Sequence, residues 1–256
     1  MKKIILLGII SLTVFLYLKK DKTISTFPIT PLPSIQPSAS PSVINSMEKI
    51  EHNDQVYYFS YKKINNLNNL HLYSNFDKKS SSQDLIKENQ CLSLFNAGFY
   101  SQDNQPLGWF VSDYQEISPF VKSSLFNGFI SLTDKLSITA VYPKTTSRFG
   151  LQSGPLLIFN NKPLILKIIN DEPRRRLIAI QTPNNGLIFL VLIGADSLFS
   201  GPLLADTPII VSAISKQIKQ DFTAALNLDG GSASTFYTSN LHLEEFSHIG
   251  SYFCEN

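Results

Sequence analysis

Short runs of alternating apolar and polar residues follow one another along the chain from about residue 50, a pattern typical of strands with one buried face. Turn-forming residues separate these runs. The clearest strand-like segments cover residues 55–64, 71–76, 92–95, 106–117, 224–228 and 235–240. Two further strand pairs are predicted as hairpins, one turning at Asn160–Asn161 and one at Asn184–Gly186, because Asn and Gly suit tight turns.

Two segments favour helices instead. Residues 80–90 carry serines suited to capping a short helix, with Asp84 in its first turn. Residues 208–222 have apolar residues at helical spacing and begin with Pro208, a common helix opener. Because strands outnumber helices, we expect an α+β fold, with a mixed, largely antiparallel sheet and a few helices in a single domain.

The N-terminal segment, residues 1–20, is typical of a membrane-targeting sequence. Lysines stand on both sides of an apolar run from residue 4 to residue 18, which is short for a membrane span and long enough for a signal sequence. It is either an uncleaved signal-anchor or a cleaved signal peptide. We therefore expect the rest of the chain outside the cytoplasm, membrane-anchored or secreted, with the membrane as a partner in the first case.

Residues 21–46 are rich in Pro, Ser and Thr and show neither a helical nor a strand period, which predicts an extended spacer. The folded domain is then expected over residues 47–256. Its two cysteines, Cys91 and Cys254, either pair in an oxidising compartment or stay as free thiols.

Charge and composition narrow the classes of function. The net charge of +2 is too small to indicate a nucleic-acid partner, and the only tight basic cluster is Arg174–Arg176. Such a cluster is enough for a small anionic substrate. The four histidines lack metal-ligand spacing, and no triad signature of a hydrolase is present. Neither a metal nor another cofactor is expected.

The stretch LNLDGGSAST, residues 226–235, combines features of a binding loop. Asp229 ends an apolar strand, so its carboxylate is expected at the rim of the core. Gly230 and Gly231 allow close approach of a ligand to the backbone and could form an anion-binding nest, while Ser234 and Thr235 add hydroxyl groups. The alternative is a tight turn in which Asp229 accepts local backbone hydrogen bonds.

Residues 96–113 repeat this arrangement. Asn96 follows a strand, Gly98 removes bulk beside it, and an amide in this place suits a sugar hydroxyl or an orienting role. Asp103 is a second carboxylate in reach of the same rim, or else a solvated turn residue. Trp109 is predicted to be a core aromatic, with sugar stacking as the alternative.

Two more stretches complete the set. Gly154 lies in a third small-residue turn that enters a strand. In the arginine cluster, strand alternation sends Arg174 and Arg176 one way and Arg175 the other. Guanidinium groups suit bidentate contacts to phosphate, although charges at a solvated sheet edge would explain the cluster equally well.

These four stretches, in this order, resemble the motifs of the phosphodiester glycosidase family over roughly residues 50–256. The resemblance implies that sugar–phosphate chemistry is carried by Asn96, Gly98, Arg175 or Arg176, Asp229, Gly230, Ser234 and Thr235. The chain departs from the family pattern at Ser232, Ala233 and the Leu-Ile-Ala-Ile run after the arginines. These departures leave open which arginine aligns and which substrate is bound.

The sequence therefore predicts a hydrolase that cleaves a sugar-1-phosphodiester in exported or envelope glycans. Phosphate is a good leaving group, so the site needs cations and N–H donors for phosphate and a carboxylate at the anomeric carbon. Asp229 is expected to act as nucleophile or as base for water, and Asn96 to orient the sugar. The expected catalytic residues are Asp229, Asn96, Arg175 and Arg176, and the expected substrate-binding residues are Gly98, Asp103, Gly154, Gly230, Gly231, Ser234 and Thr235. The alternatives are a non-catalytic module that binds envelope glycan and a structural surface protein.

Overall fold

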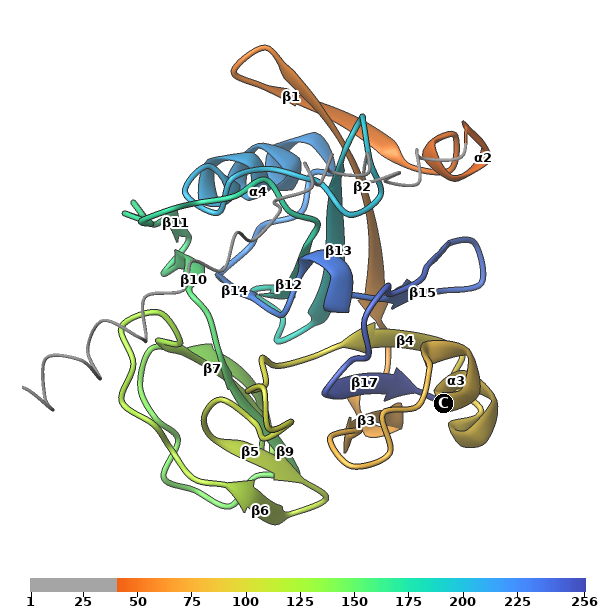
Figure 1. Cartoon of the computed structure of the whole chain (residues 1–256). Coiled ribbons are helices and arrows are strands. Elements are labelled where there is room, and N and C mark those ends of the chain that lie inside the picture. The colour runs from red at the N-terminus through yellow and green to blue at the C-terminus, as the bar shows by residue number, and fades with distance from the viewer. Residues whose placement is uncertain (1–40) are drawn as a thin grey trace, which may run out of the picture. The chain divides into compact units, whose positions relative to one another are not determined.

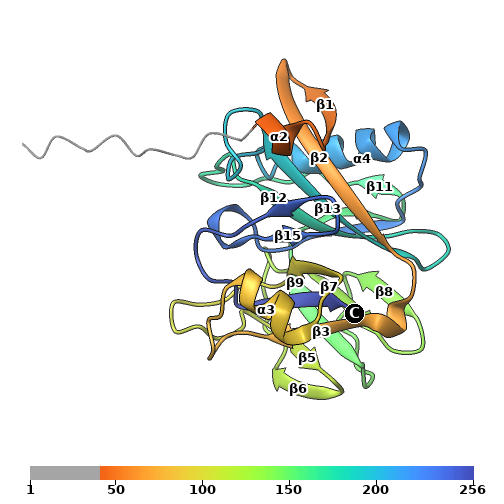
Figure 2. The same ribbon diagram turned by 90° about the vertical axis from the view of Figure 1, so that its right-hand side faces the viewer.

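The computed structural model describes residues 41–256, and within them the fold consists mostly of β-strands (Figures 1 and 2). The helices are short: α2 (Pro41–Ile44), α3 (Ser82–Asn89) and α4 (Thr207–Gln217), with 3-10 turns η1 (Leu67–Asn69) and η2 (Gly231–Ala233). Every pairing between these strands is antiparallel. The prediction of a largely antiparallel sheet is confirmed, whereas the mixed sheet and the α+β balance are corrected to a mostly β fold.

Three sheets make up the described part. The largest has the order β1 (Glu48–His52), β2 (Gln55–Ile64), β13 (Leu187–Gly194), β12 (Arg176–Gln181), β14 (Ala224–Asn227), β10 (Leu156–Phe159) and β11 (Lys162–Pro163). The second has the order β16 (His242–Leu243), β15 (Phe236–Tyr237), β4 (Ser93–Asn96), β17 (Ser251–Glu255) and β3 (Leu70–Ser74). The third has the order β6 (Gln115–Ser118), β5 (Phe110–Ser112), β9 (Phe149–Ser153), β7 (Gly128–Leu132) and β8 (Leu136–Thr139).

The largest sheet is buried on both faces, which explains why β12 and β13 are apolar at nearly every position. Side chains alternate across a strand, so Ile178 and Ile180 pack under α4 while Leu177 and Ala179 face the core shared with the other two sheets. Figure 1 shows α4 lying over this sheet, on the side away from β5 and β6. The main core is thus enclosed where the three sheets meet.

The local elements follow their sequence signals closely. The Ser81 hydroxyl accepts a hydrogen bond from the Asp84 amide and caps α3. The hairpin β10–β11 turns through Asn160 and Asn161, both with positive φ, and β12–β13 turns at residues 182–186. Trp109 is a core aromatic with 2% of its surface exposed, and its ring meets Tyr142 edge to face.

Cys91 and Cys254 form a disulfide bond, which settles the alternative that the sequence left open. It ties the segment just before β4 to β17 across a sequence separation of 163 residues. Since β4 ends at Asn96, the bond supports the sheet that carries this residue.

The predicted signal segment, residues 1–20, and most of the predicted linker lie outside the described residues. Within the described end of the linker, residues 41–44 form the single helical turn α2, where an extended spacer was expected. Over residues 41–256, no helix has both the length and the apolar character needed to cross a bilayer.

Candidate active site

The loop that follows β14 carries Asp229 and returns through η2 to β15. The Asp229 amide donates to the Ala97 carbonyl at 3.0 Å, which anchors the loop to the segment after β4. The Asn96 side chain holds the same loop at two points: its Nδ2 donates to the Asp229 carbonyl at 2.8 Å, and its Oδ1 accepts from the Thr235 amide at 2.9 Å. Asn96 therefore fixes the backbone on both sides of the two glycines.

The two glycines serve close packing of the loop on Arg175. A Cβ at Gly230 would come within 2.4 Å of the Arg175 carbonyl oxygen. Gly231 has a φ of +65°, and its amide donates to the same carbonyl at 2.8 Å. The Gly230 amide donates to Asp229 Oδ1 at 2.9 Å. Both amides are therefore bonded within the protein, to the Asp229 carboxyl and to the Arg175 carbonyl, as in the alternative of a tight turn.

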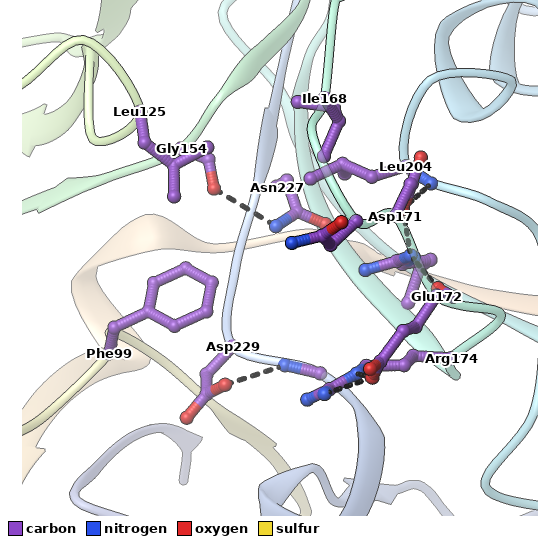
Figure 3. A pocket seen from close by; sticks show the side chains of 13 residues that line it. Phe99, Leu125, Gly154, Ile168, Asp171, Glu172, Arg174, Leu204, Asn227 and Asp229 are labelled. Carbon is purple, nitrogen blue, oxygen red and sulfur yellow. Dashed lines mark hydrogen bonds and ion pairs between the residues drawn. The ribbon is translucent and has the colours of Figure 1, made fainter.

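Asp229 lines a pocket of about 270 Å³ together with residues from several distant segments (Figure 3). The residues that line this pocket are Phe99, Leu125, Gly154, Ile168, Asn170, Asp171, Glu172, Arg174, Arg176, Leu204, Asn227, Asp229 and Gly230. Of the residues predicted from sequence, the structure brings four into this pocket: Gly154, Arg176, Asp229 and Gly230.

Burial changes the acidity of Asp229. Desolvation raises the pKa of this carboxyl to about 7, against the opposing effects of the Gly230 amide and the Arg174 charge. A carboxyl with this pKa exists in both protonation states near neutral pH, which is the range in which a general acid or base is most effective. Burial, and secondarily the Asp229 carboxylate, also raise the pKa of Tyr100.

The three arginines divide as strand alternation predicts. Arg174 and Arg176 line the pocket, and Arg175 points away from it into the protein. Arg175 Nη2 donates to the carbonyls of Ser234 and of Glu244, the latter at 2.9 Å, and the guanidinium lies 4.9 Å from the centre of the Phe199 ring. Arg175 is thus placed to hold the loop behind the pocket, and it lies outside the pocket lining.

The two pocket arginines differ in how far their side chains are buried and held by partners. Arg176 is 7% exposed and donates to the carbonyls of Pro202 and Glu172, with Asp171 3.5 Å away as its ion-pair partner. Its burial lowers its pKa to about 10, which leaves it charged at neutral pH. The side chain of Arg174 is 57% exposed and pairs with the equally exposed Glu172. Arg174 can exchange this partner for an anion at little cost, because exposed ion pairs are weak.

Asn227 is a pocket residue that the sequence analysis did not select. Its Nδ2 donates to the Gly154 carbonyl at 3.0 Å, while Oδ1 is buried and has no hydrogen-bond partner among the described residues. An unpaired buried acceptor is costly, so this atom is a natural partner for a ligand hydroxyl. Asn227 precedes Asp229 by two positions, and this spacing at a strand end was the available signal.

Phe99, Asn170, Asp171, Glu172 and Arg174 are the other polar or aromatic lining residues that were not selected. Phe99 directly follows the Asn-Ala-Gly turn, and Figure 3 shows its ring on the side of Asp229 away from Glu172 and Arg174. Asp171 accepts from the amides of Leu204 and Ala205 at 3.0 and 2.8 Å, so it holds the opposite wall. No spacing pattern connects residues 171–174 with Asp229 in the sequence.

The remaining predicted residues lie outside the pocket lining. Asp103 is exposed in a turn, as the alternative interpretation held. Gly98 packs against Leu151, where a Cβ would come within 2.6 Å of a methyl carbon. Ser234 and Thr235 are fully buried, and the Thr235 hydroxyl donates to the Leu243 carbonyl. Gly98, Ser234 and Thr235, like Asn96 and Gly231, lie outside the pocket lining and pack or hydrogen-bond within the protein.

No cluster of three or more His, Cys, Asp and Glu side chains suited to a metal ion occurs within residues 41–256.

Comparison with known proteins gives a consistent picture. A model of the phosphodiester glycosidase family matches residues 89–251, more than half of the chain. No curated protein sequence matches significantly.

Among solved structures, the fold is similar to the zebrafish N-acetylglucosamine-1-phosphodiester alpha-N-acetylglucosaminidase catalytic domain auto-inhibited by its pro-peptide, with a TM-score of 0.63 and 13% identity over 82% of this chain and 81% of that one. A hypothetical protein from Synechocystis has a TM-score of 0.55 and 12% identity over 81% of this chain and 61% of that one. A putative exported protein from Burkholderia pseudomallei K96243 has a TM-score of 0.53 and 9% identity over 78% of this chain and 73% of that one.

Proposed function

Because the chain belongs to the phosphodiester glycosidase family, we propose that it hydrolyses the bond between a sugar and phosphate in a sugar-1-phosphodiester, with Asp229 as the reacting carboxylate. The observation that carries the proposal is the shared pocket of Asp229 and Arg174. One partly buried carboxyl and one exposed, exchangeable cation meet in a hollow of about 270 Å³. Such a site matches a neutral sugar ring that is joined to an anionic group.

Arg174 binds the phosphate in this proposal. Arg176 is tied to Asp171 and to two carbonyls, so it contributes a fixed positive field and little freedom to move. Arg174 releases Glu172 and takes two phosphate oxygens in the bidentate manner typical of guanidinium groups. The family resemblance left the phosphate-binding arginine open between Arg175 and Arg176, and the pocket favours Arg174, with Arg176 beside it.

The sugar lies between Phe99 and Asn227. The Phe99 ring offers an apolar face, and the unpaired Asn227 Oδ1 accepts from a sugar hydroxyl. Asn96 was expected to orient the sugar directly, and it acts instead through the loop that presents Asp229.

The reaction uses Asp229 in its deprotonated form. The carboxylate acts at the anomeric carbon, either as nucleophile or by removing a proton from the attacking water. The leaving phosphate monoester has a low pKa and needs little help from a general acid. With the pKa of Asp229 raised to about 7, the rate constant kcat/KM is expected to rise with pH and to level off above about pH 7.

We place the domain outside the cytoplasm, with residues 1–20 as signal-anchor or signal peptide, residues 21–46 as linker and residues 47–256 as the catalytic domain. Two observations support an exported location. The disulfide between Cys91 and Cys254 is typical of an oxidising compartment. One protein of similar fold is a putative exported protein. Envelope glycans with phosphodiester links are then the expected substrates.

The test compares Asp229→Asn with the matched variant Asp103→Asn. Both change one carboxyl to an amide, and Asp103 is exposed in a turn outside the pocket. Purified residues 47–256 are assayed for release of sugar from sugar-1-phosphodiesters. We expect Asp229→Asn to lose at least about a hundredfold in kcat, the usual scale of proton-transfer catalysis, with no effect of Asp103→Asn. Full activity of Asp229→Asn would contradict the assignment, and tight binding without any cleavage by the wild type would favour a glycan-binding module.

A further inference from the structure

A second groove lies on the third sheet, beside β5 and β6. Figures 1 and 2 both show these strands at the opposite end of the described part from α4. Two hollows of about 210 and 280 Å³ adjoin here, since Tyr114, Thr145 and Thr146 line both. Neither hollow shares a lining residue with the Asp229 pocket.

The groove combines aromatic rings with hydrogen-bonding groups. Tyr114 is 62% exposed, and Tyr142 is held against Trp109 and Phe120. Trp109 Nε1 donates to Glu116 Oε2 at 3.1 Å, which fixes this carboxylate at the groove wall. Sugar rings present C–H faces to aromatic rings and hydroxyls to carboxylates and threonines. The lining is therefore suited to a carbohydrate.

The charges of the lining select against a phosphorylated segment. The Asp, Glu, Lys and Arg side chains along the two hollows are Glu116 and Asp134, which are acidic, and Lys144, which is basic. A polyanion would meet a net negative wall. A neutral saccharide loses nothing by this, because the carboxylates accept hydrogen bonds from its hydroxyls.

The backbone at Tyr114 gives an independent reason to assign a role to its side chain. Asp113 and Tyr114 form the two-residue turn of the β5–β6 hairpin, and Tyr114 has a φ of +64°. Glycine is the residue that this turn position favours, and a bulky side chain is rare there. A tyrosine that is mostly exposed makes few packing contacts to offset this cost. Its presence is explained if the ring contacts a ligand in the groove.

The strand β9 connects the groove with the active-site pocket. Ser147, two residues before β9, lines the groove, and Gly154, directly after β9, lines the pocket. The seven steps between them span about 23 Å of extended chain. A ligand that reaches both places must therefore be a polymer, because a single sugar is much shorter than this separation.

We propose that the groove around Tyr114 and Tyr142 binds an uncharged segment of a polysaccharide, at a site separate from the catalytic pocket. The binding itself does not depend on catalysis. A second consequence rests on the proposed function: the groove holds a polymeric substrate while its phosphodiester occupies the pocket near Arg174.

Affinity gel electrophoresis of the full-length protein tests the binding directly. The gels contain dextran, yeast mannan or glycol chitin as neutral polymers, and dextran sulfate as the charged counterpart of dextran. We expect at least one neutral polymer to retard the wild type, and Tyr114→Gly to bind about tenfold more weakly, the scale of one lost aromatic contact. Replacing Thr145 and Thr146 by Ala, which leaves the turn unchanged, is expected to weaken binding as well.

Asp54→Gly is the matched control. Asp54 occupies the same position of the two-residue β1–β2 turn, with a φ of +60°, and is exposed outside the groove. Its glycine variant should bind as the wild type does. The melting temperature of Tyr114→Gly should equal or exceed that of the wild type, because glycine relieves the turn. A lower melting temperature, equal loss of binding in Asp54→Gly, or retardation by none of the neutral polymers would overturn the proposal.

Two further measurements separate competing explanations. Retardation by dextran sulfate alone, or binding of a proline-rich peptide in place of any polymer, would show that the groove recognises another class of ligand and would also overturn the proposal. For the catalytic consequence, Tyr114→Gly should slow cleavage of a polymeric phosphodiester and leave a small sugar-1-phosphodiester unaffected. Because the gel measures binding without turnover, an inactive enzyme would not hide a functional groove.

Discussion

Asn96 and Asp229 are 133 positions apart in the sequence, yet the side-chain amide of Asn96 donates to the backbone carbonyl of Asp229 at 2.8 Å. The other end of the same amide accepts from Thr235, so one buried side chain spans the whole loop. Neither hydrogen bond involves the Asp229 carboxyl, which stays available to a ligand. The backbone at Asp229 is thus positioned by a buried residue that lies outside the pocket lining.

Asn96→Ala should lower both stability and turnover. The substitution leaves the Thr235 amide and the Asp229 carbonyl without these partners in a buried place, at a cost of about 1–3 kcal/mol. Since the loop loses its support, kcat should fall more than substrate affinity. Urea unfolding and steady-state kinetics measure the two effects. Asn240→Ala, in an exposed turn, should change the unfolding free energy by less than about 0.5 kcal/mol. Equal effects of the two variants would contradict the supporting role of Asn96.

Asp229→Asn should make the protein more stable at pH 8 while it abolishes activity. The folded-state pKa of about 7 lies above the ordinary value of 3.8, so the folded protein binds the proton more tightly than the unfolded chain does. Ionisation of Asp229 therefore destabilises the fold progressively as the pH rises from about 4 to about 7. The amide removes this cost and keeps an oxygen for the Gly230 amide.

The expected gain at pH 8 is on the order of 2 kcal/mol, because the carboxyl is only partly shielded from solvent. At pH 4 the folded carboxyl is neutral and the unfolded one is only about half ionised, so the two proteins should differ by no more than about 0.6 kcal/mol. Thermal unfolding at pH 4 and pH 8 provides the comparison. A gain of the same size at both pH values would show that packing, and not ionisation, explains the difference.

The arginines should separate into binding and structural classes. Arg174→Gln should raise KM for a sugar-1-phosphodiester roughly tenfold and leave the melting temperature unchanged, since this side chain is exposed and loses only a surface ion pair. The defect should be smaller at high salt, where the wild type also loses electrostatic attraction. Kinetics at two ionic strengths measure this difference.

Arg175→Met is the contrasting variant. It keeps much of the side-chain volume but leaves the carbonyls of Ser234 and Glu244 without a donor, so we expect a loss of about 2–4 kcal/mol in unfolding free energy. Affinity for free phosphate should be retained in the folded fraction. If Arg175→Met instead weakened phosphate binding and spared stability, the division between these neighbours would be wrong.

Removal of the disulfide should destabilise the fold by about 3–5 kcal/mol, because the bond closes a loop of more than 160 residues in the unfolded chain. The double variant Cys91→Ala, Cys254→Ala removes both thiols. Its melting temperature should be lower than that of the wild type and insensitive to reductant, whereas reductant should lower that of the wild type. Equal melting temperatures of the double variant and the oxidised wild type would exclude a structural role for the bond.

Local elements were predictable because their determinants are local. The Ser81 cap, the Asn160–Asn161 turn and the helix with Pro208 in its first turn each depend on a few adjacent residues, and all three are present. The alternation of the arginines was equally predictable from strand geometry. The sequence could not reveal that every strand pairs in antiparallel fashion, because pairing depends on contacts between distant segments.

Only some of the residues of the candidate site could be predicted from the sequence. Asp229 and Gly230 were found because a carboxylate before glycines at a strand end is a local signal. Arg174 and Glu172 were missed because their exposure and mutual pairing depend on how the irregular segment 170–174, before β12, lies against the pocket. Asn96 and Arg175 were selected for their chemistry, and only the fold shows that both of them face the back of the loop.

The opposite orientations of Arg174 and Arg175 make chain length near β12 as important as residue identity. Deleting or inserting one residue between Pro173 and β12 would reverse the direction in which the preceding side chains point. The guanidinium of Arg174, which is exposed, would then point into the protein interior. Insertions or deletions of two residues would leave the direction of each guanidinium unchanged. Natural variation in this segment should therefore show even-numbered length differences, or differences confined to the region before Pro173, a constraint that a comparison of single positions would overlook.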